Sequence, residues 1–420
     1  MAAALCIAGS LALVFRPGAY PPYWEGRDYV AIANGDYTHM ESFYAGRVFH
    51  PIVVRIVATI AHIPVDWRAF LWVSAASLIL FFCTLGAYFG IEFPSRPWLC
   101  IPLIATATVM DQYRNYYWHD LFYAALCAIF FLALRANRWA SLPILFLLFM
   151  TRESTIMLVI ALVTVAAVRR QWLFSASSLV VGVAGFKTTA ALVARALPGH
   201  HGIPVIVLDF LKLPFNFALN VCGLEFWTNT DAATIHEVPK WIVNLPLGLH
   251  LGNIHQIGYC GFFWQRPAEL LMLLASAFGL LPLLACRALA HRRGRWLFRK
   301  FDYTIAFTYG GLMFVLTPLI GTLPSRYVLY AWPVFWILGA ALVHMLFSET
   351  REQLEFVLLC VLASWVPALV QRVTGSPLRQ PSSLIELSAI GLILSLAILA
   401  ALYVRGYLLI KAALRKANTV

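Results

Sequence analysis

Charged residues are scarce in this sequence of 420 residues. Asp, Glu, Lys and Arg make up 12% of the chain, about half of the roughly 25% typical of soluble domains, while 61% of the residues are hydrophobic. This shortage excludes a soluble enzyme and a disordered protein, because neither combines so few charges with so much apolar surface. The composition predicts an integral, multi-pass membrane protein.

Several signature motifs are also missing. The sequence has no CxxC or HExxH pattern, no GxGxxG or Walker A loop, and no repeat of solenoid length. The net charge of +12 forms no basic stretch interleaved with polar surface, so we expect no nucleic-acid partner. Five histidines between 198 and 266 are irregularly spaced, and we expect no cofactor, although the sequence leaves room for a divalent metal.

Apolar stretches predict an all-α, polytopic membrane protein with about 12 transmembrane helices in a single membrane domain, 1–420. Spanning takes about 20 residues, so four of the stretches are short for a span. The first has no small-residue cleavage site before Arg16, which indicates a retained helix or a truncated start. The stretches lie at about 2–15, 67–90, 97–110, 116–134, 139–150, 154–168, 173–197, 268–286, 303–320, 327–347, 353–370 and 384–408.

Positive charges predict the side that each end of a helix faces. The loop 287–300 holds six Lys and Arg residues, and the positive-inside rule places it in the cytoplasm. Arg135, Arg169 and the basic C-terminal tail then fall on the same side. The segments 16–66 and 198–266 become outer loops, and the short apolar run from Pro51 to Ile63 is expected as an interfacial helix.

Two of the eight cysteines, Cys222 and Cys260, share the second outer loop, and the other six lie in or beside apolar stretches. An oxidising compartment allows the two to pair if their geometry permits it. A disulfide and two free thiols are both compatible with the sequence.

The first outer loop places polar and aromatic residues beside the membrane. Asp28 begins an expected short helix, where it is either a helix cap or a general base that accepts a proton from an acceptor hydroxyl. Arg47 and His50 follow in AGRVFHP, and Arg47 can pair with a phosphate through two parallel hydrogen bonds or extend to lipid headgroups. The loop is therefore a candidate site for a sugar and its phosphate lipid.

Charged residues also lie where two later spans meet the outer face. In NYYWHDLFYAAL, Asp120 stands at a membrane boundary as a helix cap or a functional carboxylate, His119 precedes it, and a spacing of four predicts that Tyr116 lies beside it on one helical face. In FMTREST, Arg152 and Glu153 divide about thirty apolar residues, which predicts a hairpin of two half-spans with both charges at its outer turn. Neighbours on a helix point in different directions, so we expect their partners elsewhere in the site.

The segment SRYVLYAWP begins a late span with Arg326 and Tyr327. An arginine at an outer helix N-terminus opposes the helix dipole and needs an anionic partner. A lipid phosphate can provide that partner.

These motifs resemble those of the GT-C class of polytopic glycosyltransferases, especially the bacterial branch that uses polyprenyl-phosphate sugars. GRDYVAIA is similar to the family's first outer loop, which carries an essential Asp, and AGRVFHPIVVR to its Arg-x-x-x-Pro stretch. NYYWHDLFYAAL, TRESTIM and SRYVLYAWP are similar to its outer-face Asp, its interrupted span and its late Arg-Tyr segment. The resemblance covers the chain to about residue 347.

The resemblance implies a GT-C-like fold in the bacterial inner membrane, with an active site that faces the periplasm. The implied reaction moves a sugar from a polyprenyl-phosphate donor to an unidentified glycan, lipid or protein acceptor, with Asp28 as general base and inversion at the anomeric carbon. Membrane lipids are the other expected partners. The predicted substrate-binding residues are Arg47, His50, Tyr116, His119, Asp120, Arg152, Glu153, Arg326 and Tyr327.

Two other classes also fit part of the pattern. A transporter or a flippase for lipid-linked sugars suits many spans with buried charges, but transporters carry internal repeats and charges near the bilayer midplane, and neither is evident here. A membrane-bound acyltransferase with His119 as its base is the third hypothesis. It is disfavoured because Asp120 is too close in sequence to orient the imidazole well.

Overall fold

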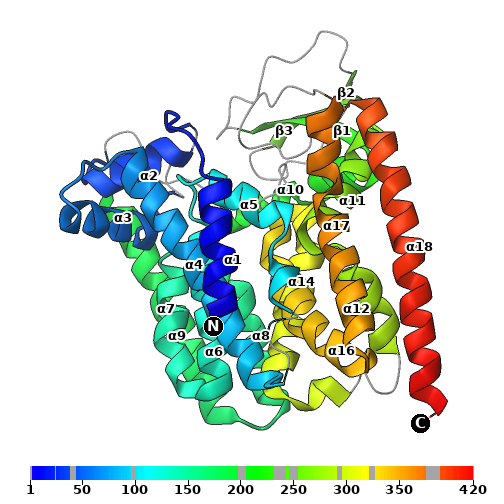
Figure 1. The fold of residues 1–420 in the computed structure, drawn as a ribbon. Coiled ribbons are helices and arrows are strands. Elements are labelled where there is room, and N and C mark those ends of the chain that lie inside the picture. Colours follow the sequence, from blue (N-terminus) through cyan, green and yellow to red (C-terminus); the bar gives the residue numbers. More distant parts are fainter. Residues whose placement is uncertain are drawn as a thin grey trace.

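Apolar helices run side by side in the computed structural model of the chain, which is the structure described here (Figure 1). The structure describes residues 2–23, 25–37, 44–95, 98, 100–196, 205–230, 243–245, 254–290, 296–320, 327–374 and 388–419. The first half of the bundle contains α1 (Ala2–Val14), α4 (Trp67–Glu92), α6 (Asp120–Ala136), α7 (Ser141–Phe149), α8 (Thr155–Val168) and α9 (Trp172–Ala196). The second half contains α11 (Gln265–Phe278), α12 (Leu281–Ala290), α14 (Phe301–Ile320), α16 (Leu338–Leu346), α17 (Thr350–Thr374) and α18 (Ala389–Thr419).

Five helices in the described residues are long and apolar enough to cross a membrane, and a bent pair, α11 with α12, raises the number to six. The five are Trp67–Glu92, Trp172–Arg195, Val328–Leu346, Thr350–Thr374 and Ala389–Lys416. These helices fit the predicted integral, multi-pass membrane protein. The predicted number of twelve spans is not confirmed, because four further apolar helices, Ala2–Val14, Phe49–Ile60, Arg138–Phe149 and Thr155–Val168, are shorter than a span.

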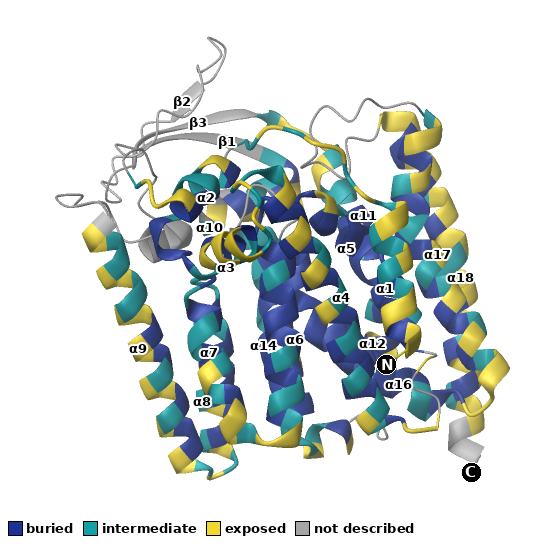
Figure 2. Ribbon diagram, turned by 60° about the vertical axis from the view of Figure 1, so that its left-hand side comes forward, coloured by how far each residue is buried: buried dark blue, intermediate teal, exposed yellow. Residues whose placement is uncertain are grey.

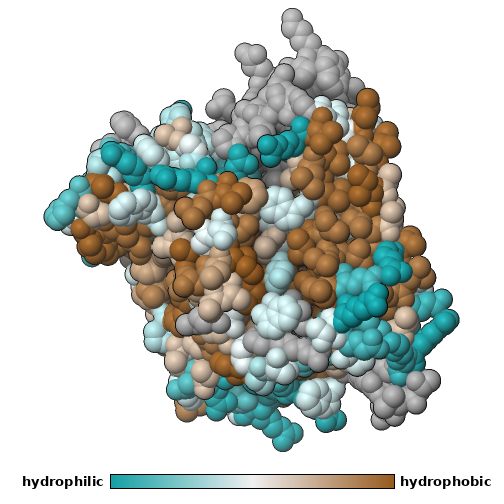
Figure 3. Space-filling model, in the orientation of Figure 1, coloured by the Kyte–Doolittle hydropathy of each residue, from teal (hydrophilic) through white to brown (hydrophobic). Residues whose placement is uncertain are grey.

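The surface of the bundle carries a broad hydrophobic region with hydrophilic residues at its upper left and lower edges, as lipid requires (Figure 3). Helices α9 and α18 lie at opposite edges of the bundle in Figure 2 and are exposed along much of their length. Only 17% and 22% of their most apolar windows is buried, against 89% for Val328–Leu346. The segment Val328–Leu346 therefore lies in the core of the bundle.

The apolar stretch 97–110, expected as one of the shorter spans, is not a single helix. It contains the 3-10 turn η3 (Ile101–Ile104) and the start of α5 (Ala107–Arg114), where Thr106 caps the new helix. The carbonyl of Ala105 between them accepts a hydrogen bond of 2.9 Å from the indole Nε1 of Trp365. A side chain thus satisfies a backbone group that the broken helix leaves open.

The stretch 268–286 is also broken, since α11 and α12 meet at an angle of 85°. Gly279 lies at the bend with a φ of 55°, and a Cβ there would be 2.2 Å from the carbonyl oxygen of Cys360. Only glycine fits this close approach.

Two short helices and a 3-10 turn from the segment 16–66 lie across the upper left of the bundle in Figure 1. They are α2 (Glu25–Asn34), η1 (Tyr44–Gly46) and α3 (Phe49–Ile60). Helix α3 has 12 residues, about 18 Å, and exposes Ile52, Ile56 and Ile60. The helix is too short to span a membrane, and its predicted place in the membrane interface stays a prediction.

The segment 198–266 contains a helix that was not predicted and the only strands in the described residues. Helix α10 (Val205–Cys222) packs against α14, where Asn216 and Asn220 donate hydrogen bonds of 2.9 Å to the carbonyls of Leu319 and Pro318. Strands β1 (Leu224–Thr230), β2 (Val243–Leu245) and β3 (Ile254–Phe262) form an antiparallel sheet in the order β1-β3-β2. Cys222 is an exposed free thiol, and the side chain of its suggested partner Cys260 lies outside the described residues.

The lower end of the bundle is held by an ionic cluster around Glu92. This carboxylate, 1% exposed, pairs with Arg135 from α6 and with Lys300 Nζ at 2.5 Å. Arg169, at the turn between α8 and α9, donates to the carbonyl of Arg299 at 2.9 Å. The predicted cytoplasmic residues Arg135, Arg169 and Lys300 therefore gather at one end.

Candidate active site

The turn between α7 and α8 forms the tip of a short helical hairpin, as predicted. Trp139, just before α7, packs its ring 5.4 Å from that of Phe174 at the start of α9, so α7 and α8 begin and end near the same, lower level. The two arms have 9 and 14 residues, about 14 and 21 Å, which is less than the roughly 30 Å of a hydrocarbon core. The hairpin that carries Arg152 and Glu153 at its tip is therefore shorter than a pair of full spans.

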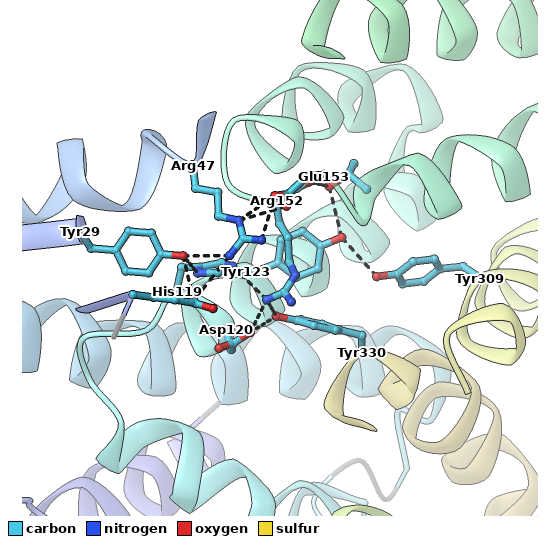
Figure 4. A network of polar contacts seen from close by, with 11 residues as sticks. Tyr29, Arg47, His119, Asp120, Tyr123, Arg152, Glu153, Tyr309 and Tyr330 are labelled. Atoms are coloured by element: carbon cyan, nitrogen blue, oxygen red, sulfur yellow. Dashed lines mark hydrogen bonds and ion pairs between the residues drawn. The ribbon is translucent and has the colours of Figure 1, made fainter. Parts of the chain in front are cut away.

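Arg152 is the centre of a buried polar cluster (Figure 4). Its Nη1 lies 2.5 Å from Asp120 Oδ1 and 3.0 Å from His119 Nε2, and it also contacts the hydroxyl of Tyr330. The Tyr330 hydroxyl in turn donates to Asp120. The side chains of Arg152 and Asp120 are 3% and 0% exposed, so this ion pair is almost dry.

The hydrogen bonds fix the protonation of His119. Arginine only donates, so the Nε2 that faces Arg152 carries no proton and Nδ1 carries it. Nδ1 then donates to the hydroxyl of Tyr29 at 2.9 Å, and that oxygen also accepts from Arg47 Nη1 at 3.1 Å. The Tyr29 proton is left to point at Glu25 Oε2, 3.2 Å away. A continuous chain of bonds thus links the two arginines through a neutral imidazole.

Arg47 is buried beside this chain and directs two nitrogens at Glu153. Its Nε and Nη2 lie 2.9 and 2.8 Å from Oε1 of that carboxylate, and its Nη1 lies 3.5 Å from Glu25. Burial alone lowers the pKa of Arg47, but the charges of Glu153 and Glu25 raise it well above its usual value. Arg47 therefore stays charged. We call this set the arginine network: Glu25, Tyr29, Arg47, His119, Asp120, Arg152, Glu153 and Tyr330.

Neighbouring elements hold the arginine network in place. The backbone N–H of Phe49, at the start of α3, donates to the carbonyl of Met150 at the hairpin tip, 3.0 Å away. Thr155 donates to the Arg152 carbonyl at 2.7 Å, and its hydroxyl oxygen lies 3.3 Å from the hydroxyl of Tyr123. The segment 16–66 and the hairpin are therefore joined by a backbone hydrogen bond beside the two arginines.

The structure brings most of the predicted site residues together. Arg47, His119, Asp120, Arg152 and Glu153 belong to the arginine network. The ring of Tyr327 lies 5.0 Å from the Arg152 guanidinium. The predicted partners of Arg152 and Glu153 are thus found on other elements, as expected.

His50 lies at the edge of the arginine network. Its ring centre is 6.2 Å from that of Tyr29 and 5.3 Å from that of Phe122, and 1% of the residue is exposed. Its Nδ1 has no hydrogen-bond partner within the described part of the chain. Burial lowers the pKa of His50 to about 3, against a smaller opposing effect of Asp120, so the imidazole is neutral near pH 7.

Three other predicted residues stand apart from these contacts. The expected helical pairing of Tyr116 with Asp120 is wrong, because α6 begins only at Asp120; the Tyr116 hydroxyl instead accepts from the backbone N–H of Tyr20 at 3.2 Å. Asp28 is half-buried on α2, one turn after Glu25, and its role as a base stays a prediction. Arg326 lies outside the described residues.

Sequence reasoning missed three members of the arginine network, Glu25, Tyr29 and Tyr330. Glu25 and Tyr29 are four residues apart, which places them on one face of α2, but the spacing does not show what that face meets. Tyr330 follows Tyr327 by three residues in an aromatic run and gives no such signal.

No group of three or more His, Cys, Asp or Glu side chains within the described ranges is arranged to hold a metal ion. No family model, no curated protein and no solved structure matches this chain.

Proposed function

We propose that this protein is a GT-C-like glycosyltransferase that transfers a sugar from a polyprenyl-phosphate donor to an acceptor at the upper end of the bundle. In this proposal the chain crosses a bacterial inner membrane about twelve times. The upper end faces the periplasm, because the basic cluster at the lower end fits the positive-inside rule.

The observation that carries the proposal is the open edge of Arg152. All its described hydrogen bonds leave from Nη1, and no described residue pairs with Nε or Nη2. These two nitrogens form the edge of a guanidinium that binds a phosphate through parallel hydrogen bonds. The Arg152 side chain is 3% exposed, and in such surroundings a charge-assisted pair with an anion is stronger than in water, which supports an anionic ligand at this open edge.

Each of these side chains has a role in the proposed reaction. The acceptor hydroxyl attacks the anomeric carbon and gives its proton to Asp28, a new C–O bond forms, and the bond from that carbon to the phosphate oxygen breaks. Negative charge grows on the departing polyprenyl phosphate, and Arg152 stabilises it from its open edge. Asp120, His119 and Tyr330 hold the guanidinium in orientation.

The test is transfer by the purified full-length protein in proteoliposomes, with a panel of radiolabelled polyprenyl-phosphate sugars and a crude envelope extract as the acceptor source. We expect loss of label from one donor, release of polyprenyl phosphate, and a labelled product. Arg152→Lys keeps the charge that Asp120 needs and should slow transfer by about 100-fold or more, while Arg138→Lys, at the opposite end of the hairpin, should retain it.

The same vesicles separate the proposal from its main rival. Movement of labelled lipid-linked sugar between leaflets without any glycosylated product would replace the transferase with a flippase. Full transfer by a folded Asp28→Asn variant would remove Asp28 as the base and leave the phosphate site standing.

A further inference from the structure

A small basic pocket lies at the lower end of the bundle, far from the arginine network. It has a volume of about 140 Å³ between α12 and α18, which suits a single phosphate group and is too small for the 300–1,000 Å³ of ordinary small-molecule sites. Its lining residues are Arg287, Tyr407, Ile410, Lys411, Leu414 and Arg415.

Three cations line this pocket, and two of them contact one aromatic ring. The Arg287 guanidinium lies 4.8 Å from the centre of the Tyr407 ring, and the Lys411 Nζ lies 6.0 Å from it. The lining contains no acidic side chain, and Arg287, Lys411 and Arg415 have no carboxylate partner among the described residues. The pocket therefore concentrates uncompensated positive charge.

Neighbouring cations on the same helix differ in this respect. Arg405 pairs with Glu355, and Lys416 Nζ lies 2.5 Å from Glu352. Ion pairs therefore form where α18 meets α17, whereas Lys411 and Arg415 on the pocket side of α18, and Arg287 on α12, have no such pair among the described residues. Because the pocket cations have no carboxylate partner in the described residues, an anion from outside the protein is the expected partner.

The pocket lies at the level of lipid headgroups. Lys416 contacts Glu349 and Glu352 at the start of α17, and His344 at the end of α16 packs against Phe93, next to the Glu92 cluster. Hydrophilic residues gather at this lower right part of the molecule in Figure 3, below the apolar surface of α17 and α18. Arginine, lysine and tyrosine at such a boundary are typical of lipid anchoring.

We infer that this pocket binds the phosphate of an anionic phospholipid from the adjoining leaflet and that the lipid fastens α18 to α12. Only 22% of the most apolar window of α18 is buried, so most of this helix surface is left for lipid. A headgroup shared by Arg287 of α12 and by Lys411 and Arg415 of α18 adds a bridge between the two helices. The inference does not depend on the proposed glycosyl transfer.

The experiment measures thermal unfolding of the full-length protein in phosphatidylcholine nanodiscs with and without one-third phosphatidylglycerol. A ligand that binds only the folded state raises Tm, and we expect a rise of about 3–5 °C for the natural sequence. The double variant Arg287→Gln/Arg415→Gln should lose most of that rise. The matched control Arg299→Gln/Arg351→Gln removes two exposed charges outside the pocket, one from η5 (Trp296–Arg299) and one from the start of α17, and should keep it.

Two further arms complete the test. Inorganic phosphate in phosphatidylcholine nanodiscs should give no comparable rise; an equal rise would show that the ligand is a free anion and overturn the lipid assignment. Equal rises in the pocket and control variants, or no rise in the natural sequence, would overturn the site itself. If the double variant does not fold, the single variant Lys411→Gln, at an exposed position, takes its place in the comparison.

Discussion

Glu153 occupies the edge of Arg47 that would otherwise bind a phosphate, since the Arg47 Nε and Nη2 atoms lie 2.9 and 2.8 Å from its Oε1. The corresponding edge of Arg152 is open. The arginine network places two arginines against three carboxylates, those of Glu25, Asp120 and Glu153. A further anion adds to this negative excess, so we expect Glu153, whose side chain is 36% exposed, to release Arg47 when a phosphate binds.

Glu153→Gln should therefore improve binding of the donor. The amide keeps a hydrogen bond to Arg47 but removes the charge that competes with phosphate, and about 1 kcal/mol of lost competition corresponds to a roughly fivefold fall in KM. The measurement is KM for the polyprenyl-phosphate sugar in proteoliposomes. Glu349→Gln, at the lower end, is the control and should leave KM unchanged. A higher KM for Glu153→Gln would show that Glu153 contacts the substrate directly.

Arg152→Lys should lower kcat by about 100-fold or more, the scale of losing one preorganised donor to a developing oxyanion. Lysine can still pair with Asp120, but it presents a point charge in place of two parallel donors. The comparison is kcat of the Lys variant against Arg138→Lys, with Tm measured for both. A Lys variant with natural kcat would contradict the role given to the open edge of Arg152.

The sequence located the hairpin tip because Arg152 and Glu153 are charges inside a long apolar run. Such residues are costly there unless they are partnered, so their positions alone are informative. Glu25 and Tyr29 lie in a polar segment where a carboxylate or a hydroxyl costs little. Their importance depends on which face of α2 meets His119, and only the tertiary arrangement sets that.

The spans were less predictable for a different physical reason. Hydropathy reports that a stretch is apolar but not that its backbone stays helical. Gly279 permits a bend of 85° because a glycine has no Cβ to clash with the nearby carbonyl of Cys360. At Ala105 the chain leaves the helical path, and the indole of Trp365 donates the hydrogen bond that the Ala105 carbonyl accepts. Helix α10 was missed because Asp209 and Lys212 interrupt its apolar pattern.

Tyr29→Phe should destabilise the protein by about 1–3 kcal/mol, the usual penalty for unpaired buried polar groups. The substitution removes the acceptor for His119 Nδ1 and for Arg47 Nη1. Tm in detergent is the measurement. Tyr23→Phe is the matched control, because its hydroxyl donates to the neutral amide oxygen of Asn115 at a partly buried position, and it should cost less. Equal losses in the two variants would argue against the proton arrangement assigned to His119.

Glu92→Gln should destabilise the bundle without changing the active site. Removing this carboxylate leaves Arg135 and Lys300 without a shared partner, and breaking a buried pair costs about 3–5 kcal/mol. Arg135 is fifteen residues after Asp120 on α6, or about 22 Å along the helix. We therefore expect a lower Tm and an unchanged KM for the donor. A changed KM in a folded Glu92→Gln variant would mean that the two ends are coupled.

His50 should make the stability of the protein depend on acid. Its folded pKa of about 3 lies below the unfolded value of 6.5, so between these values the unfolded chain binds more protons and stability falls as the pH falls. The stabilising contribution of neutral His50 to the free energy of unfolding is complete above about pH 6.5, and roughly 2 kcal/mol of it is lost at pH 5. Because Gln does not titrate, the His50→Gln variant should lose less Tm than the natural sequence between pH 7.5 and pH 5. Parallel losses in the two proteins would mean that His50 gains a proton in the folded state, with Asp120 as the charged neighbour that favours it.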